Sequence, residues 1–195
     1  HTISRLFPVF APETPRIVCG KKHAHEIVRD VEALDISSDG KLIHEPCGRN
    51  TAPAVLLGAL EILRQERDAV IFIFPADHVI ADIPAFHEKV NTAISLAMTG
   101  HIVTFGIRPN YPETGYGYIE GGDEIAEGAL SLIRFVEKPD RETADAYLDA
   151  GNFFWNSGMF AFRASVIAEE FEAFQPELLG QMREILAQGE NISKK

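Results

Sequence analysis

Short apolar runs alternate with amphipathic segments through the first half of the 195-residue chain, and this alternation constrains the fold more than any other feature. The strand-like runs are residues 16–19, 41–44, 69–74 and 102–107. The segments between them with helical spacing of apolar residues are 21–34, 54–63 and 86–97. The run 69–74 is apolar throughout, as is typical of a central parallel strand covered on both faces. The pattern predicts an α/β fold with a doubly wound, mainly parallel sheet flanked by helices.

The second half of the chain has a different pattern, with Gly-rich turns between its strand-like runs. The predicted strands are residues 116–120, 130–137 and 153–163. The predicted helices are residues 141–150, 165–174 and 176–187. We expect this half to continue the sheet with both parallel and antiparallel strands and with inserted hairpins. No internal repeat or low-complexity linker interrupts the sequence, so we expect a single domain over residues 1–195.

Charge and hydropathy exclude several classes of protein. The chain has 18 Lys and Arg against 29 Asp and Glu, a net charge of −11, which argues against nucleic-acid binding because that requires a basic surface. No apolar run is long enough to cross a membrane, and the N-terminus lacks the features of a signal peptide. Cys19 and Cys47 have no metal-ligand spacing. We therefore expect free thiols in a reducing compartment, the cytoplasm, with no nucleic-acid or membrane partner.

Unusual polar residues follow the predicted strands, where ligands bind in sheets of this kind. Glu45 lies on a Pro-containing turn, and its carboxylate can accept the two hydrogen bonds that guanine offers from N1–H and its 2-amino group. Arg49 in the same loop can face a phosphate. The same residues also fit a turn that leads into a helix N-cap, with a solvated Glu and Arg.

Asp77 follows the central apolar strand in the sequence Pro75-Ala76-Asp77-His78. A carboxylate there is well placed for Mg²⁺ shared with nucleotide phosphates, because Mg²⁺ prefers one or two carboxylates with phosphate oxygens and water. An Asp that caps the next helix or turn is the alternative. His78 is a weaker candidate, since the chain has no HExxH or matching His pair.

Gly117 between two tyrosines is suited to a close approach of backbone and ligand, with Tyr116 and Tyr118 as walls for a sugar or base. A tight turn with core aromatics is the alternative. Asn156, beside the only tryptophan, offers a donor and an acceptor to a hydroxyl-rich ligand, but also fits an aromatic core. The glycines at positions 115, 117 and 121 lack the G-x-G-x-x-G spacing of a dinucleotide fingerprint.

Strand alternation over residues 132–137 places Glu137 on one face with Ile133 and Phe135, and Lys138 on the other. Glu137 can accept hydrogen bonds from vicinal sugar hydroxyls, and Lys138 can neutralise a phosphate. An exposed ion pair of little consequence is the alternative. The chain contains neither the GxxxxGK[ST] pattern of P-loop NTPases nor a GxSxG nucleophile elbow.

Five blocks occur together in this order: EPCGRNTAPA, FPADHVI, GIRPNYPETGYGYIE, RFVEKPD and WNSGMFAFRAS. Together they resemble the mannose-1-phosphate guanylyltransferases, in the bacterial type that is sometimes fused to a phosphomannose isomerase domain. The resemblance spans roughly residues 2–165. It implies a nucleotidyltransferase fold with a Rossmann-like mixed sheet. It also implies transfer of GMP from GTP to mannose 1-phosphate with Mg²⁺, as a step of polysaccharide biosynthesis.

Roles are carried over to this chain residue by residue. The resemblance implies guanine binding by Glu45, with Arg49 and Asn50 in the same loop, and Mg²⁺ binding by Asp77. It implies sugar contacts at Tyr116, Gly117, Glu137 and Asn156, and a phosphate-binding base at Lys138. Asp77 and Lys138 are then the expected catalytic residues.

The chain also departs from the family pattern. That pattern opens with a Gly-rich loop, GGxGxRLxPLS, and a PKQF segment, and it has a second metal-binding Asp in a DVGSW-like motif; none of these occurs here. We therefore expect a domain that is incomplete at both ends and inactive as an isolated piece. A nucleotidyltransferase for another sugar 1-phosphate, and a non-catalytic sugar-nucleotide-binding regulator, remain alternatives. The sequence leaves open a homo-oligomer and an isomerase domain beyond residue 195.

Overall fold

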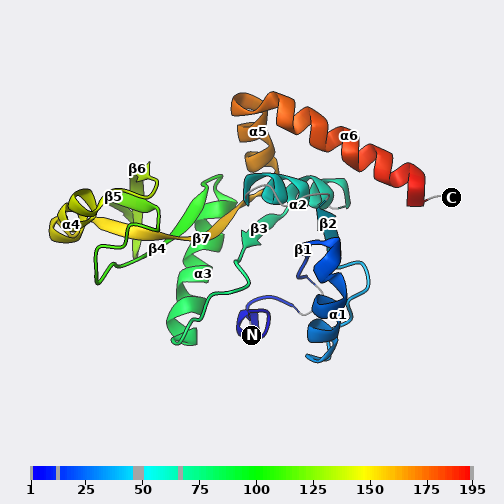
Figure 1. The fold of residues 1–195 in the computed structure, drawn as a ribbon, viewed down its shortest axis with the longest axis horizontal. Helices are drawn as coiled ribbons and strands as arrows, with labels where there is room; N and C mark the ends of the chain where they lie inside the picture. Colours follow the sequence, from blue (N-terminus) through cyan, green and yellow to red (C-terminus); the bar gives the residue numbers. More distant parts are fainter. Residues whose placement is uncertain (1, 12–13, 46–50, 66–67, 194–195) are drawn as a thin grey trace.

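Two sheets and the helices around them make up the computed structural model, which describes residues 2–11, 14–45, 51–65 and 68–193 (Figure 1). The strands are β1 (Ile17–Gly20), β2 (Leu42–Glu45), β3 (Val70–Ile73), β4 (Val103–Ile107), β5 (Tyr118–Ala126), β6 (Ala129–Val136) and β7 (Phe153–Arg163). The helices are η1 (Ser4–Leu6), η2 (Lys21–His23), α1 (Ala24–Glu32), α2 (Thr51–Gln65), α3 (Ile83–Met98), α4 (Arg141–Ala150), α5 (Ala164–Phe174) and α6 (Pro176–Ser193).

The long strand β7 organises the larger sheet. It pairs antiparallel with β3, β4 and β5, and β5 in turn pairs antiparallel with β6. β3 and β4 occupy opposite edges of β7, because Ile73 and Thr104 both pair with Phe160. β4 and β5 are also on opposite edges, because Ile107 and Tyr118 both pair with Trp155. β3 and β5 therefore follow one another along the same edge of β7.

The α/β fold class and the mixed character of the second half are confirmed, with one correction to the strand pairing. The pattern predicted a parallel sheet in the first half, but only β1 and β2 pair in parallel among the described residues. β3 and β4 run in the same direction without touching, because β7 lies antiparallel between them. A strand from the distant second half has thus entered the sheet, which local periodicity could not reveal.

Apolar helix faces cover both sides of this sheet. α2 packs on Ile71 and Phe162, while α3 packs on the other side through Val90, Ala93 and Ala97, with Met159 and Ala161 beneath it (Figure 1). α4 covers a third cluster, which consists of Tyr118, Ala144, Phe153, Trp155 and Tyr147. The helix predicted over residues 54–63 is confirmed as part of α2, and it is well buried, since Leu56, Leu57, Ala59 and Leu60 are buried.

Helix ends follow from local capping chemistry. Asp82 begins α3 by accepting a hydrogen bond from the Ala85 N–H at 3.0 Å, and Gly100, which follows this helix, has φ +93°, a conformation typical of a C-terminal cap. Asp140 begins α4 by accepting from the Thr143 backbone N–H and side chain, and these hydrogen bonds lower the pKa of Asp140. The capped ends fix where α3 and α4 start, and so where the loops after β3 and β6 end.

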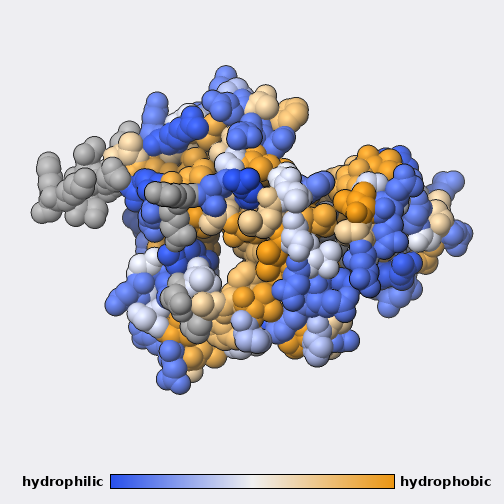
Figure 2. Space-filling model, turned by 180° about the vertical axis from the view of Figure 1, so that it is seen from behind, coloured by the Kyte–Doolittle hydropathy of each residue, from blue (hydrophilic) through white to orange (hydrophobic). Residues whose placement is uncertain are grey.

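Exposed apolar side chains gather on β6, at Leu130, Leu132, Ile133 and Phe135. Figure 2 shows apolar surface at this end of the molecule and along its middle. None of the helices in the described part of the chain is long and apolar enough to span a bilayer.

Candidate functional site

β3 and β5 leave a short stretch of one β7 edge uncovered. β3 ends opposite Phe160, and β5 begins opposite Trp155, so residues 156–159 pair with neither strand. The loop after the carboxyl end of β3 and the turn before β5 meet at this stretch. Ligands of open α/β sheets bind at such places, where neighbouring connections diverge.

A row of four residues crosses the sheet here, from β6 to β4. Gly117, just before β5, accepts a hydrogen bond from the Asn156 N–H at 2.8 Å, and Asn156 pairs with Gly106 of β4. Glu137, just after β6, completes the row, because a Cβ on Gly117 would lie 3.2 Å from Glu137 Oε2. Strand spacing puts the backbones of Glu137 and Asn156 roughly 10 Å apart. Three of the predicted sugar-binding residues thus lie side by side.

Gly117 is a glycine because the ring of Phe135 lies against it. A Cβ there would be 2.5 Å from Phe135 Cζ, closer than real Cβ contacts allow. Phe135 and Glu137 therefore share the face of β6 that looks toward Gly117, as strand alternation predicted. The half-exposed ring gives an apolar surface next to a carboxylate, a combination suited to a sugar.

Glu137 and Lys138 form an ion pair with Nζ 3.2 Å from Oε1. Both side chains are more than half exposed, so the pair contributes little to folding stability. Lys138 has φ +42°, an uncommon conformation for a residue with a side chain. The turn directs the acid and the base, which strand alternation alone would place on opposite faces, toward one another.

Asp77 lies in the loop after β3, and its exposed carboxylate has no hydrogen-bond or ion-pair partner among the described residues. The loop begins next to the uncovered stretch of β7, since a Cβ on Gly158 would be in contact with Pro75 Cγ at 3.5 Å. Asp77 follows Pro75 by two residues in this loop. The backbone carbonyl of its neighbour His78 accepts a hydrogen bond from Arg5.

The N-terminal segment holds the Asp77 loop in place. Arg5 donates to the His78 carbonyl at 2.5 Å and to Thr2 Oγ1 at 3.0 Å, and Thr2 donates to the Ala76 carbonyl at 2.8 Å. Burial lowers the pKa of Arg5. A hollow of about 580 Å³ lies between the two segments. It is lined by Thr2, Ser4, Arg5, Phe7, Ala76, Asp77, His78, Val79, Ile80 and Ile83.

The donors at this hollow are compatible with Mg²⁺ bound jointly with a ligand. A single exposed carboxylate, that of Asp77, meets the preference of Mg²⁺ for one or two carboxylates plus phosphate oxygens and water. Within the described ranges, no group of three or more His, Cys, Asp or Glu could hold a metal unaided.

The predicted guanine-binding loop falls largely outside the described residues. Glu45 ends β2, where its backbone pairs with Gly20 of β1, at the carboxyl ends of two parallel strands. Arg49 and Asn50 lie outside the described residues. The structure therefore gives the backbone position of Glu45, at the end of β2, and does not test the guanine-binding prediction for these three residues.

Two residues that pack against or bond to the site, Tyr111 and Thr104, were not predicted from the sequence. The Tyr111 ring packs edge-on against Trp155 at 4.8 Å, on the same indole that Tyr116 contacts at 5.4 Å. Burial, and then the nearby Tyr116 and Glu113, raise the pKa of Tyr111. Thr104 of β4 reaches Asn156 from the opposite edge of β7. Its only sequence signal was a lone polar residue within an apolar strand.

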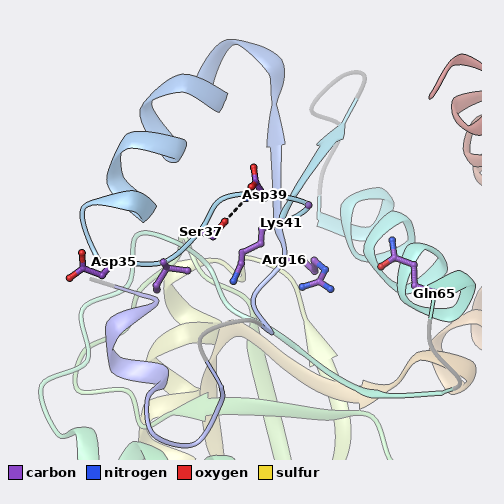
Figure 3. Close-up of a pocket in the computed structure, with 8 residues that line it drawn as sticks. Arg16, Asp35, Ser37, Asp39, Lys41 and Gln65 are labelled. Atoms are coloured by element: carbon purple, nitrogen blue, oxygen red, sulfur yellow. Dashed lines mark hydrogen bonds between the residues drawn. The ribbon is translucent and has the colours of Figure 1, made fainter. Parts of the chain in front are cut away.

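A second hollow, of about 600 Å³, lies at the other ends of β1 and β2 (Figure 3). Arg16 precedes β1 and Lys41 precedes β2, so the hollow is at the amino ends of these strands. It is lined by Arg16, Asp35, Ile36, Ser37, Asp39, Gly40, Lys41 and Gln65. None of the residues predicted to bind ligand is among them.

Comparisons with known proteins show the family of this chain. The profile of the family described as nucleotidyl transferase matches residues 1–194. The chain belongs to the nucleotidyl transferase family. The fold predicted from the sequence blocks, that of a nucleotidyltransferase, is confirmed.

Curated relatives of this nucleotidyl transferase have informative names. The chain is 44% identical, over 92% of its length, to a mannose-1-phosphate guanylyltransferase of Klebsiella pneumoniae, and 45% identical, over 89%, to the xanthan biosynthesis protein XanB of Xanthomonas campestris. It spans 38% and 36% of these relatives' own lengths.

Solved structures with the same fold carry two different titles. The chain superposes with a TM-score of 0.84 at 34% identity on a Thermus thermophilus protein titled mannose-1-phosphate geranyltransferase, covering 95% of this chain and 53% of that one. A Helicobacter pylori structure titled mannose-6-phosphate isomerase gives a TM-score of 0.80 at 30% identity, with coverages of 93% and 67%.

Proposed function

We propose that this nucleotidyl transferase transfers GMP from GTP to mannose 1-phosphate, giving GDP-mannose and pyrophosphate. The observation that carries the proposal is the 44% identity, over 92% of the chain, to a protein named mannose-1-phosphate guanylyltransferase. The name of a second relative, a xanthan biosynthesis protein, supports a product used for polysaccharide. We place the reaction in the cytoplasm, as the cysteine usage of the sequence led us to expect.

The row across the sheet supports the sugar end of this proposal. Glu137 offers carboxylate oxygens to vicinal hydroxyls, and Asn156 lies across Gly117 from it. Tyr116, packed against Trp155, provides an aromatic wall. The residues together match a ligand with hydroxyl groups on one side and an apolar ring face on the other.

The chemistry needs no general base. The nucleophile is a phosphate oxygen of mannose 1-phosphate, largely ionised at pH 7 because the second pKa of a phosphate monoester is about 6. This oxygen attacks the α-phosphorus of GTP, the bond to the β-phosphate bridging oxygen breaks, and pyrophosphate leaves with that electron pair. The difficulty is to bring two anions into line, so positioning and charge neutralisation are the tasks of the protein. Lys138 neutralises negative charge at the sugar phosphate.

At the nucleotide end, Glu45 would bind guanine and Arg49 with Asn50 would contact the nucleotide from the same loop. Asp77 would hold Mg²⁺ together with phosphate oxygens. When bound, Mg²⁺ would supply positive charge that offsets the negative charge of the phosphates. The carboxylate of Asp77, which is exposed, lines the hollow and has no partner within the described part of the chain, supports this assignment.

Steady-state kinetics of the purified full-length protein would test the proposal. Pyrophosphate release and GDP-mannose formation are measured with GTP, mannose 1-phosphate and Mg²⁺, beside a panel in which ATP replaces GTP and glucose 1-phosphate replaces mannose 1-phosphate. We expect the highest kcat/KM for GTP with mannose 1-phosphate. A higher value for another pair would overturn the substrate assignment.

A further inference from the structure

Asn156 begins a bulge in β7. Between Asn156 and Phe160, β7 uses four residue steps where the facing strand uses two, from Gly106 to Thr104. Gly158 inside the bulge has φ +70°, which glycine adopts without steric cost. Bulges next to binding sites commonly redirect a side chain. Here the bulge turns the backbone N–H of Gly158 back toward the side chain of Asn156.

Two donors meet the side-chain oxygen of Asn156. The Gly158 N–H donates to Oδ1 at 3.2 Å, and Thr104 Oγ1 lies 3.1 Å from the same atom. A backbone N–H can only donate, so the amide atom that faces Gly158 must be the oxygen. The Met159 carbonyl oxygen lies 3.2 Å from the same hydroxyl, whose single proton is shared between the two acceptors, so Thr104 contacts both ends of the bulge.

The amide nitrogen of Asn156 therefore points away from Thr104 and Gly158. No hydrogen bond from Nδ2 to a described residue is present, and Nδ2 is not one of the buried polar atoms that lack a partner. Since those buried atoms are Arg5 Nε, Tyr118 Oη and Trp155 Nε1, the Asn156 nitrogen is accessible from solvent. A ligand at the site can reach its two N–H groups.

We infer that Thr104 is a positioning residue for the sugar-phosphate site, and that Asn156 offers its ligand N–H donors only. The inference rests on the proposed function and deepens it. The ligand atom next to Asn156 is then an acceptor oxygen of the sugar phosphate. Because the amide oxygen is already used within the protein, a ligand hydroxyl cannot donate to it without breaking the contacts with Gly158 and Thr104.

Glu137 and Asn156, two members of the row, then have opposite hydrogen-bonding character. Glu137, when ionised, only accepts hydrogen bonds, and Asn156 only donates them. The backbone of Gly117 separates the two groups. A sugar phosphate is bound in one orientation, with hydroxyl donors toward Glu137 and an acceptor oxygen toward Asn156.

Three variants at Thr104 and a distant control test the positioning role in the full-length protein. Thr104→Val removes the hydroxyl at constant shape, Thr104→Ser restores it, and Thr92→Val removes a hydroxyl that bonds the Glu88 carbonyl on the surface of α3. We expect Thr104→Val to raise the KM for mannose 1-phosphate about tenfold, as loss of one hydrogen bond implies. The KM for GTP should stay unchanged, and Thr104→Ser and Thr92→Val should resemble the wild type.

Asn156→Asp tests the donor assignment, since a carboxylate keeps both acceptor positions but has no N–H. We expect kcat/KM for mannose 1-phosphate to fall at least about a hundredfold. An unchanged KM in Thr104→Val, or an equal rise in Thr104→Ser, overturns the positioning role, and an unchanged kcat/KM in Asn156→Asp overturns the donor assignment.

Calorimetry of mannose 1-phosphate binding to each protein distinguishes failure of this inference from failure of the proposed function. Wild-type binding without turnover refutes the proposed function alone, and equal binding by Thr104→Val and wild type refutes the inference alone.

Discussion

Asp77 is held by contacts to the backbone on either side of it, which leave its carboxylate exposed. Thr2 and Arg5 bond the carbonyls of Ala76 and His78, the residues that flank it. This is the geometry expected for a side chain whose partner arrives with the substrate. The local sequence predicted the position of Asp77 after a buried strand, but the clamp joins residues more than 70 positions apart and could not be predicted.

Replacing Asp77 by Asn should abolish most metal-dependent turnover. The amide keeps the shape but not the charge, so we expect kcat to fall by about 10²–10³, the effect typical of removing one group that stabilises charge in the transition state. Pyrophosphate release is measured against Mg²⁺ concentration. Asp149→Asn, the same change on the exposed surface of α4, serves as the control. Turnover of Asp77→Asn equal to this control would remove Asp77 from the site.

Replacing Glu45 by Gln should reduce the preference for GTP over ATP. Guanine offers two adjacent donors, and a neutral amide accepts them less strongly than a carboxylate does. We expect the ratio of the two kcat/KM values to fall roughly tenfold, in line with a hydrogen bond to a charged group worth about 1.5–3 kcal/mol. Glu170→Gln on the exposed side of α5 is the matched control. An unaltered ratio would reject Glu45 as the guanine-binding residue.

At the scale of elements, two glycine substitutions should have opposite effects on stability. Gly117→Ala places a methyl group 2.5 Å from the Phe135 ring, so we expect loss of about 1–3 kcal/mol of unfolding free energy and a higher KM for mannose 1-phosphate. Gly180→Ala in α6 meets nothing within 4 Å and should stabilise the protein by about 0.5–1 kcal/mol. Chemical denaturation of both variants measures the difference. Equal midpoints would contradict the packing described for Gly117.

The elements themselves follow closely from local sequence. The predicted helix 141–150 and strand 153–163 have the observed bounds of α4 and β7, because Asp140 caps one end of the helix and Gly151, at φ +74°, closes the other. The pairing of β7 with both β3 and β4 was not predictable from local pattern. It depends on contacts between residues roughly 50 to 90 positions apart, which periodicity does not record.

The same limit applies to the site. Strand alternation predicted correctly that Phe135 and Glu137 share a face. The bulge that aims Asn156 depends on register against β4, and the brace from Thr104 comes from 52 residues away. Residue type and position after a strand therefore pointed to candidate side chains, while their orientation required the folded chain.

At the scale of the whole molecule, Asp68 links the start of β3 to the junction of β7 and α5. It accepts hydrogen bonds from the Ser165 N–H at 2.9 Å, from Ser165 Oγ at 2.6 Å and from the Arg163 guanidinium. Burial pushes the pKa of Asp68 up, but the hydrogen bonds from Ser165 and Arg163 outweigh it, and the net pKa is lowered. The ionised carboxylate thus favours the folded state.

This lowered pKa predicts a specific loss of stability in acid. The stabilisation is fully present above the unfolded-state value of about 3.9 and disappears as the pH falls through the lower folded-state pKa. Asp68→Asn should cost about 1–3 kcal/mol at pH 7, and the difference from wild type should shrink below about pH 4. Urea unfolding at pH 7 and pH 3 measures both quantities. A difference that is constant with pH would show that the charge of Asp68 contributes nothing.

In the proposed function, the uncovered stretch of β7 would set the spacing between the two substrates. At one end Gly158 lies next to Pro75 of the loop that carries Asp77, and at the other Asn156 belongs to the row that we propose binds the sugar. In the proposed reaction, residues 156–158 of this one backbone would then set the distance between the attacking phosphate oxygen and the phosphorus of the nucleotide. We expect a change in the length of this stretch to leave both substrates bound but unable to react.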